Sequence, residues 1–185
     1  MKKSNDPWYI HAALWVVIAI LTFLLIQVSI IEPTEITRLE NYYKTESRAR
    51  MTNLKQAEML YEEIHGKYSD NLDTLINFIK TDSTVHALMV GVDTVTNKST
   101  NPFVNLTDGK FTPESLYTSP RSGKYFIVKI DTTLEVDTVI NRRGRIVKID
   151  STITIGTRYV IESPDSKDKI GDLYSDALKN TSSWE

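Results

Sequence analysis

The chain offers few residues whose types and spacing could carry out chemistry. Its three histidines, His11, His65 and His86, lie far apart in the sequence, and none belongs to a metal-binding spacing such as HExxH. We expect His11 inside an apolar helix, His65 at a helix end, where the helix dipole favours a cation, and His86 in a strand. Phosphate-binding glycine loops and the GxSxG nucleophile motif are absent. The sequence therefore predicts a protein that is not an enzyme and that holds no cofactor or metal.

Two clusters of charged residues could bind a ligand or partner, or could simply be solvent-facing. Asp165 and Asp168 lie in the polar segment SPDSKDK, where calcium binding is the alternative to solvent-facing charge. The spacing of an EF-hand loop is missing, which favours solvent-facing charge. Arg142, Arg143 and Arg145 fall at the tip of an expected hairpin, where they indicate a surface turn or a contact with an anionic partner.

One three-residue sequence pattern recurs along the chain. Asp followed by Ser or Thr and then by an aliphatic, Ala, Met or Thr residue begins at six aspartates. This pattern is similar to a three-residue O-glycosylation signal that some Gram-negative bacteria use on exported proteins. The alternative is ordinary turn and strand-end chemistry of Asp-Thr and Asp-Ser. The acceptors of the glycosylation hypothesis are Thr74, Ser83, Thr94, Thr132, Thr138 and Ser151.

The composition narrows the class of protein. The 185 residues suit one modest globular domain with appendages. The chain has no cysteine, which excludes disulfides and cysteine-ligated metal sites. The formal net charge is −2 and no basic face stands out, so nucleic acid is not an expected partner.

The segment from Trp8 to Ile31 contains 24 residues without Asp, Glu, Lys or Arg, and a helix needs about 20 apolar residues to span a membrane. Two lysines precede it, which predicts residues 1–7 as a cytoplasmic tail and an outward-facing remainder. A cleavable signal peptide is the alternative, but its apolar run is normally shorter and ends in a small-residue site. We therefore expect a single-pass inner-membrane protein with a periplasmic C-terminal domain. The predicted anchor residues include Trp8, Trp15, Phe23 and Ile31.

A helical stem is expected over residues 32–65. Pro33 suggests a restart of the helix with Thr34 as its N-cap, and residues 44–52 break the apolar pattern and predict a solvated stalk. The apolar residues on either side fall at helical spacing and form a candidate packing surface for a partner. This stem stripe consists of Ile36, Leu39, Tyr43, Leu54, Ala57 and Tyr61.

The stem is expected to end at Gly66, a residue suited to the left-handed position after a helix. Ser69 or Asp70 would then cap a short second helix, whose apolar stripe would close on the lower half of the stem. That second stripe consists of Leu72, Leu75, Ile76 and Ile79.

Alternating apolar residues predict an antiparallel β-meander in the last third of the chain. The expected strands are residues 124–130, 133–140, 145–155 and 158–163, with the segment NRRG at 141–144 as a turn. The fold class is therefore α+β: an anchor at 8–31, a stem at 32–65 and a head at 66–185 that carries the antiparallel sheet.

The order of these elements, with a glycine and two tyrosines at the first helix break, resembles type IV pilins and, among them, the major pseudopilins of type II secretion. The matching residues are Tyr61, Gly66, Lys67, Tyr68, Leu72, Leu75 and the C-terminal segment Ser183–Glu185. The prepilin peptidase motif is missing, because Pro7 precedes the apolar helix and no acidic residue lies within that helix.

The resemblance implies a structural or assembly protein of the bacterial envelope that acts through protein–protein contacts. The implied partners are the membrane, other envelope or secretion-system proteins, and a second copy of the chain. The alternative function is a membrane-anchored binding or sensory module for a small ligand or glycan.

Overall fold

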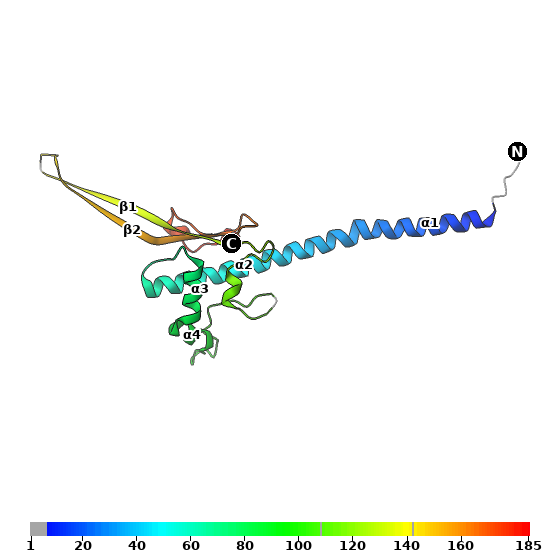
Figure 1. Ribbon diagram of the computed structural model, residues 1–185, viewed down its shortest axis with the longest axis horizontal. Helices are drawn as coiled ribbons and strands as arrows, with labels where there is room; N and C mark the ends of the chain where they lie inside the picture. Colours follow the sequence, from blue (N-terminus) through cyan, green and yellow to red (C-terminus); the bar gives the residue numbers. More distant parts are fainter. Residues whose placement is uncertain (1–6, 108, 142) are drawn as a thin grey trace. The chain divides into compact units, whose positions relative to one another are not determined.

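A computed structural model describes residues 7–107, 109–141 and 143–185 (Figure 1). The chain divides into two compact units, Met1–Lys44 and Thr45–Glu185. The α+β class and the antiparallel sheet are confirmed. The helices are α1 (Trp8–Ile26), α2 (Glu32–His65), α3 (Leu72–Thr81) and α4 (Ser83–Val90), with a π-helical turn at Gln27–Ile31 and 3₁₀ turns at Pro113–Leu116 and Asp176–Leu178. The strands are β1 (Ile127–Ile140), β2 (Ile146–Glu162) and β3 (Lys169–Gly171).

The first unit contains α1, the π-helical turn and the beginning of α2. By length and composition this apolar helix could cross a membrane, as the sequence predicts. The expected restart at Pro33 is wrong, because the chain is helical from Trp8 to His65. The π turn, in which the amide of Glu32 donates to the carbonyl of Gln27, provides room for the proline ring. The hydroxyl of Thr34 donates to the carbonyl of Ile31 (2.8 Å) and does not act as an N-cap.

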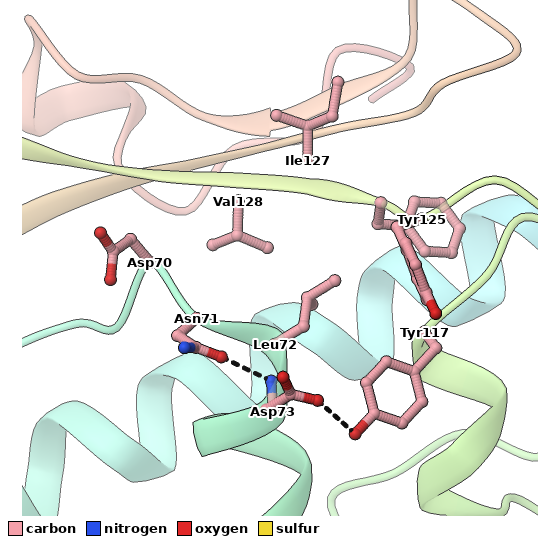
Figure 2. Close-up of a pocket in the computed structure, with 9 residues that line it drawn as sticks. Asp70, Asn71, Leu72, Asp73, Tyr117, Tyr125, Ile127 and Val128 are labelled. Carbon is pink, nitrogen blue, oxygen red and sulfur yellow. Dashed lines mark hydrogen bonds between the residues drawn. The ribbon is translucent and has the colours of Figure 1, made fainter.

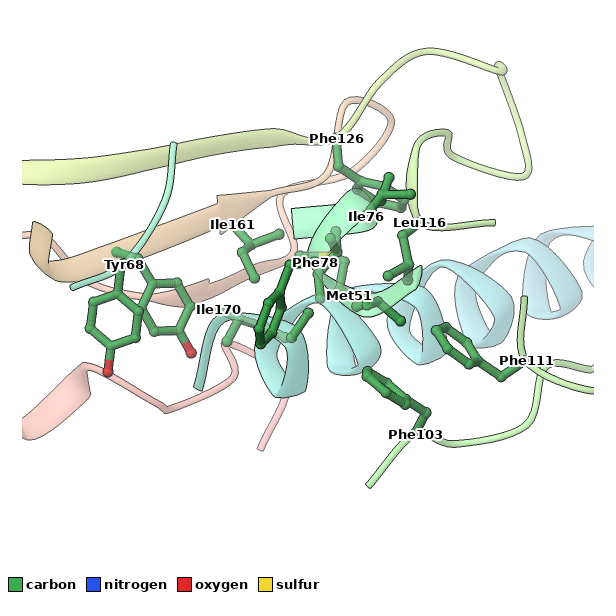
Figure 3. Close-up of a cluster of buried hydrophobic side chains, with 14 of the residues drawn as sticks. Met51, Tyr68, Ile76, Phe78, Phe103, Phe111, Leu116, Phe126, Ile161 and Ile170 are labelled. Carbon is green, nitrogen blue, oxygen red and sulfur yellow. The ribbon is translucent and has the colours of Figure 1, made fainter. Parts of the chain in front are cut away.

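The core of the second unit forms where α2 meets α3, as the two apolar stripes predict. Met51, Leu54 and Ala57 of α2 have no exposed surface, and Leu75, Ile76, Phe78 and Ile79 of α3 are buried. Residues from the loops and the sheet complete the cluster, among them Phe103, Phe111, Leu116, Phe126, Ile161 and Ile170 (Figure 3). Apolar burial of this kind is the main source of stability for such a unit.

The turn between α2 and α3 differs from the expectation in one detail. Gly66 has the predicted left-handed conformation (φ +72°), and its amide donates to the carbonyl of Glu62 (2.7 Å). The N-cap of α3 is Asn71, whose Oδ1 accepts hydrogen bonds from the amides of Asp73 and Thr74. Neither Ser69 nor Asp70 caps this helix, because the Ser69 hydroxyl accepts from the amide of Asn71.

The expected strand around His86 is also wrong, because this residue lies in α4. Asp82 begins that helix by accepting hydrogen bonds from the amides of Thr84 (2.8 Å) and Val85 (3.2 Å). An aspartate followed by Ser and Thr is a strong N-cap sequence, and here it prevails over the alternation of apolar residues.

The predicted solvated stalk at residues 44–52 is wrong, because Glu46, Ser47 and Met51 within it are buried. Glu46 is only 1% exposed, and its carboxylate accepts from Arg50 Nε (3.0 Å) and from the amide of Thr107 (2.8 Å). Arg50 in turn donates to the carbonyl of Thr118 (2.7 Å). The polar side chains therefore join α2 to distant loops, which is why the apolar stripe is interrupted there.

The sheet contains two long strands and one short strand, in the order β1-β2-β3, where the sequence predicts four strands. The turns expected near residues 131 and 156 are one shared irregularity in the β1–β2 pairing. There the Asp131 carboxylate accepts from the amides of Thr157 (2.8 Å) and Arg158 (2.7 Å). Gly156 has φ +75° and its carbonyl accepts from the amide of Tyr68 (2.9 Å), an approach that a side chain would obstruct.

Candidate functional site

The part of the β1–β2 hairpin beyond Asp131 forms an arm, which we define as residues 132–155. Among the residues that the structure describes, the strands of this arm pair only with each other. The arm exposes large β-branched side chains, namely Val139, Ile146, Val147, Ile149, Ile153 and Ile155. Alternate residues of a strand share a face, which places Val147, Ile149, Ile153 and Ile155 together. Exposed apolar surface of this kind is typical of regions that contact other molecules.

The arm ends in a tight basic tip. The amide of Asn141 donates to the carbonyl of Arg145, and the amide of Gly144 donates back to the carbonyl of Asn141, both at 2.9 Å. The Asn141 side chain accepts from the amides of Arg143 and Arg145. The side chains of these two arginines are exposed, whereas the predicted third member, Arg142, lies outside the described residues. The tip therefore presents at least two guanidinium groups on a fixed turn.

A groove of about 540 Å³ lies where α3 begins beside the first residues of β1 (Figure 2). Its walls combine two acidic side chains, two tyrosines and apolar groups from α3 and β1. The lining residues are Asp70, Asn71, Leu72, Asp73, Tyr117, Tyr125, Phe126, Ile127 and Val128.

Charge and aromatic rings converge in this groove. The Tyr117 hydroxyl donates to Asp73 Oδ1 (2.7 Å), and this bond to a carboxylate raises the pKa of the tyrosine above its ordinary value. The rings of Tyr117 and Tyr125 lie edge to face with 6.0 Å between centroids. Tyr125 is 66% exposed, and Asp70 is exposed as well. Carboxylates beside accessible aromatic faces suit a cationic group, above all a guanidinium.

The groove also borders an open strand edge. The amide of Phe126 donates to the carbonyl of Tyr117 (3.1 Å) at the side of β1 away from β2. Because alternate residues direct their backbone groups to the same edge, those of Val128 continue this row. Within the described ranges they bond to no other segment. An extended peptide could therefore add to β1 at the groove.

The stem stripe divides into two parts. Leu54 and Ala57 have no exposed surface, and Tyr61 packs with its ring against Phe78 (5.3 Å between centroids). The prediction that Leu54 and Ala57 contact a partner is therefore wrong, because they belong to the core of the protein. Tyr43 is half-buried, with its ring edge to face with that of Tyr42, while Ile36 and Leu39 are exposed. The predicted anchor residues Trp8, Trp15, Phe23 and Ile31 are all exposed in the first unit.

Five of the six glycosylation acceptors, Thr74, Ser83, Thr94, Thr132 and Thr138, are exposed, and the side chain of Ser151 lies outside the described residues. Three of the preceding aspartates make structural hydrogen bonds. Asp82 caps α4, Asp131 bridges to β2, and Asp93 accepts from the amide of Val95 (2.9 Å) and the hydroxyl of Thr96 (2.6 Å). The turn interpretation accounts for these aspartates, and modification of the acceptors stays a prediction that the intact mass of the native protein would test.

The two aspartates considered for calcium have protein partners. Asp168 forms an ion pair with Arg48 (2.9 Å), whose guanidinium also lies over the Trp184 ring (5.0 Å). Asp165 accepts from the hydroxyl of Ser119 and the amide of Ser122. Over residues 7–107, 109–141 and 143–185, no cluster of three or more His, Asp or Glu side chains could hold a metal ion. These carboxylates serve to fasten loops to the core.

Glu58 is a buried acid that the sequence analysis did not single out. Its side chain has no exposed surface, Oε2 accepts from the amide of Ser69 (3.1 Å), and Oε1 has no partner in the part of the chain that the structure describes. Burial raises the pKa of Glu58 to about 8, against 4.5 for an ordinary glutamate. The group is therefore protonated at neutral pH in the folded protein.

The groove was also missed by sequence reasoning. Asp73 and Tyr117 are separated by 44 positions, and no spacing in the sequence announces their contact. The aspartate at the start of a helix and the cluster of tyrosines are each common for structural reasons alone.

Comparison of the chain with protein-family models, with curated proteins and with solved structures finds no match.

Proposed function

We propose that the chain is a single-pass inner-membrane protein of the bacterial cell envelope, pseudopilin-like in organisation and without enzymatic activity. Its apolar helix holds it in the membrane, and its head, on the periplasmic side, makes structural or assembly contacts with other envelope or secretion-system proteins. The observation that carries this proposal is the arm, whose exposed isoleucines and valines have no cover within the described chain.

The arm has the properties of a contact surface. Its backbone is held by antiparallel pairing of β1 with β2, and the Asp131 carboxylate joins the two strands at the base of the arm, so that the side chains of its apolar face are arranged on a regular strand pair. A preorganised apolar surface loses little conformational entropy on binding. The exposed upper part of the stem, with Ile36 and Leu39, offers a second and smaller apolar surface in the other unit.

Cysteine crosslinking in native membranes tests the proposal. The chain has no cysteine, so a single introduced thiol reacts at one site. Ile153→Cys places it on the apolar face, and Thr154→Cys places it one residue later on the opposite face. We expect a short bifunctional reagent to join the Ile153→Cys variant to another protein and to leave the Thr154→Cys variant unjoined. Equal behaviour of the two variants would contradict an interface on the apolar face.

A binding or sensory module is the second candidate function, and the groove supports it. Aromatic rings beside carboxylates and an asparagine are also found where proteins bind small ligands or glycans. Titration of the full-length protein with a library of neutral and cationic sugars, measured by isothermal titration calorimetry, would test this alternative. Saturable binding that Tyr125→Ala abolishes would favour it over an assembly role for the groove.

A further inference from the structure

We infer that the groove of one copy receives the arginine-bearing tip of a second copy, so that the heads join head to tail. This inference rests on the proposed function, since it gives one identity to the partner of the head. It assigns the groove at Asp70 and Asp73 and the tip at Arg143 and Arg145 as two halves of one contact.

The two surfaces are complementary in charge. The groove carries the carboxylates of Asp70 and Asp73 at its rim, and the tip carries the exposed guanidinium groups of Arg143 and Arg145. A guanidinium can bind a carboxylate through two parallel hydrogen bonds and stack on an aromatic ring at the same time. The exposed ring of Tyr125 lines the same groove as these carboxylates and is accessible for such stacking.

The apolar residues beside each charged group are complementary as well. The tip is followed by Ile146 and Val147, which are about two-thirds exposed, and the groove contains Leu72 and Val128. An extended segment from the tip could also form backbone hydrogen bonds with the open edge at Val128. Docking would thus cover apolar surface and pair charges at one site.

A tip cannot reach the groove of its own chain. The groove lies at the beginning of β1 and the tip follows its last residue, Ile140. Ile140 lies twelve positions after Val128 in β1, which corresponds to about 40 Å at the usual rise of a strand. Pairing with β2 on both sides of the irregularity at Asp131 keeps the strand extended, so that it does not fold back. The contact must therefore join two molecules.

The geometry also defines the kind of assembly. Each copy that donates a tip keeps its own groove open, and each copy that receives one keeps its own tip. Such heterologous contacts extend into a ring or a linear polymer and do not close into a symmetric dimer. Membrane anchoring of every copy would raise their effective concentration in the plane of the membrane.

Charge reversal in the full-length protein tests the inference. The mass of the protein in detergent micelles is measured by sedimentation over a range of concentrations, with folding checked by circular dichroism. We expect concentration-dependent association of the wild type, weakened at least about tenfold by Asp70→Lys or by Arg143→Glu alone. The double variant should recover association, because its reversed charges again match. Lys98→Glu, which changes an exposed charge elsewhere, is the control and should associate normally.

Neutral variants test the direction of the contact. The Asp70→Asn variant has a weakened groove and an intact tip, and the Arg143→Gln variant has a weakened tip and an intact groove. In a mixture, the tip of the first variant can bind the groove of the second, but the pair cannot extend further. The mixture should therefore form pairs and no longer species. A wild type that stays monomeric at all concentrations, or a double variant that remains as weak as the single ones, would overturn the inference. If either of these results were obtained while the Ile153→Cys variant still crosslinked to a different envelope protein, the proposed function would stand. Only the second copy would then be removed as the partner of the groove.

Discussion

The buried half of α2 and the arm differ in the polarity of their buried and exposed side chains: α2 buries charged residues, whereas the arm exposes apolar ones. In α2, Glu46 and Glu58 have 1% or less of their surface exposed, while in the arm Ile149 and Ile153 are about 60% exposed. The carboxylates are buried because distant segments supply partners, the amides of Thr107 and Ser69. The isoleucines are exposed because no other segment of the described chain covers that face of the arm. Hydropathy therefore predicts burial only where another segment is available to cover the residue.

The difference also separates two roles for these regions. A buried carboxylate with fixed partners contributes little net stability but is costly to disrupt, so it helps to define how α2 is oriented against the loops. An exposed isoleucine contributes little to folding and retains its apolar surface for a later contact. The polar residues of α2 thus belong to the architecture of the head, whereas the apolar residues of the arm are available for function.

Removal of the Glu46 carboxylate is expected to have the largest effect. Glu46→Ala leaves the guanidinium of Arg50 and the amide of Thr107 without their partner in a buried site. Loss of one member of a buried ion pair typically lowers the free energy of unfolding by about 3–5 kcal/mol. Chemical denaturation of the full-length protein in micelles, followed by circular dichroism, measures the change.

Glu35→Ala provides the matched control in the same helix. Glu35 pairs with Arg38 at 3.5 Å, with both side chains largely exposed, and such pairs contribute at most about 1 kcal/mol. If the two variants were equally stable, the buried network around Glu46 would not hold α2 in place.

Replacement of Glu58 by glutamine is expected to have an effect of opposite sign. The pKa in the folded protein, about 8, lies above the unfolded value near 4.5, so the folded protein binds more protons between these limits. The free energy of unfolding therefore falls as the pH rises from about 4.5 to 8, and it is level above that range. Glu58→Gln removes this slope and should stabilise the protein by roughly 4 kcal/mol at pH 8.

Thermal unfolding of both proteins at several pH values between 4 and 9 measures the effect. The two curves should converge near pH 4.5 and separate as the pH rises. A wild-type stability that did not change over this range would show that the Glu58 carboxylate ionises without cost, contrary to its burial.

Much of the α-helical part of this fold follows from local sequence. The apolar helix from Trp8, the stripe of α3 and the glycine at position 66 each depend on residues within one or two turns, and the structure contains all three. The turn at 141–144 was predicted on the same basis, since its glycine and asparagine act locally. These elements require no knowledge of distant partners.

The features that could not be predicted all depend on contacts between distant segments. Residues 44–52 were interpreted as solvated because their partners, such as the amide of Thr107 and the carboxylate of Asp168, lie 61 and 120 residues away. Two strands were expected in place of β1 because Asp131 resembles a turn residue, whereas its carboxylate bridges to the amides of β2. The groove requires Asp73 and Tyr117 to meet, which only the folded chain brings about.

The smallest effect is expected for the truncation of an isoleucine in the arm, and this prediction compares one residue type in two environments of the same strand. Ile153 is 63% exposed, whereas Ile161, eight positions later in β2, has no exposed surface. Ile153→Ala should change the free energy of unfolding by less than about 0.5 kcal/mol, as is usual for surface positions. Ile161→Ala should lower it by about 2–5 kcal/mol, because a cavity forms in the core. Denaturation curves of the two variants at equal protein concentration give the comparison directly.

The opposite outcome would be a large loss of unfolding free energy for Ile153→Ala at a low protein concentration, where copies are apart. It would mean that the arm packs against its own head and that its apolar face is not free for a partner.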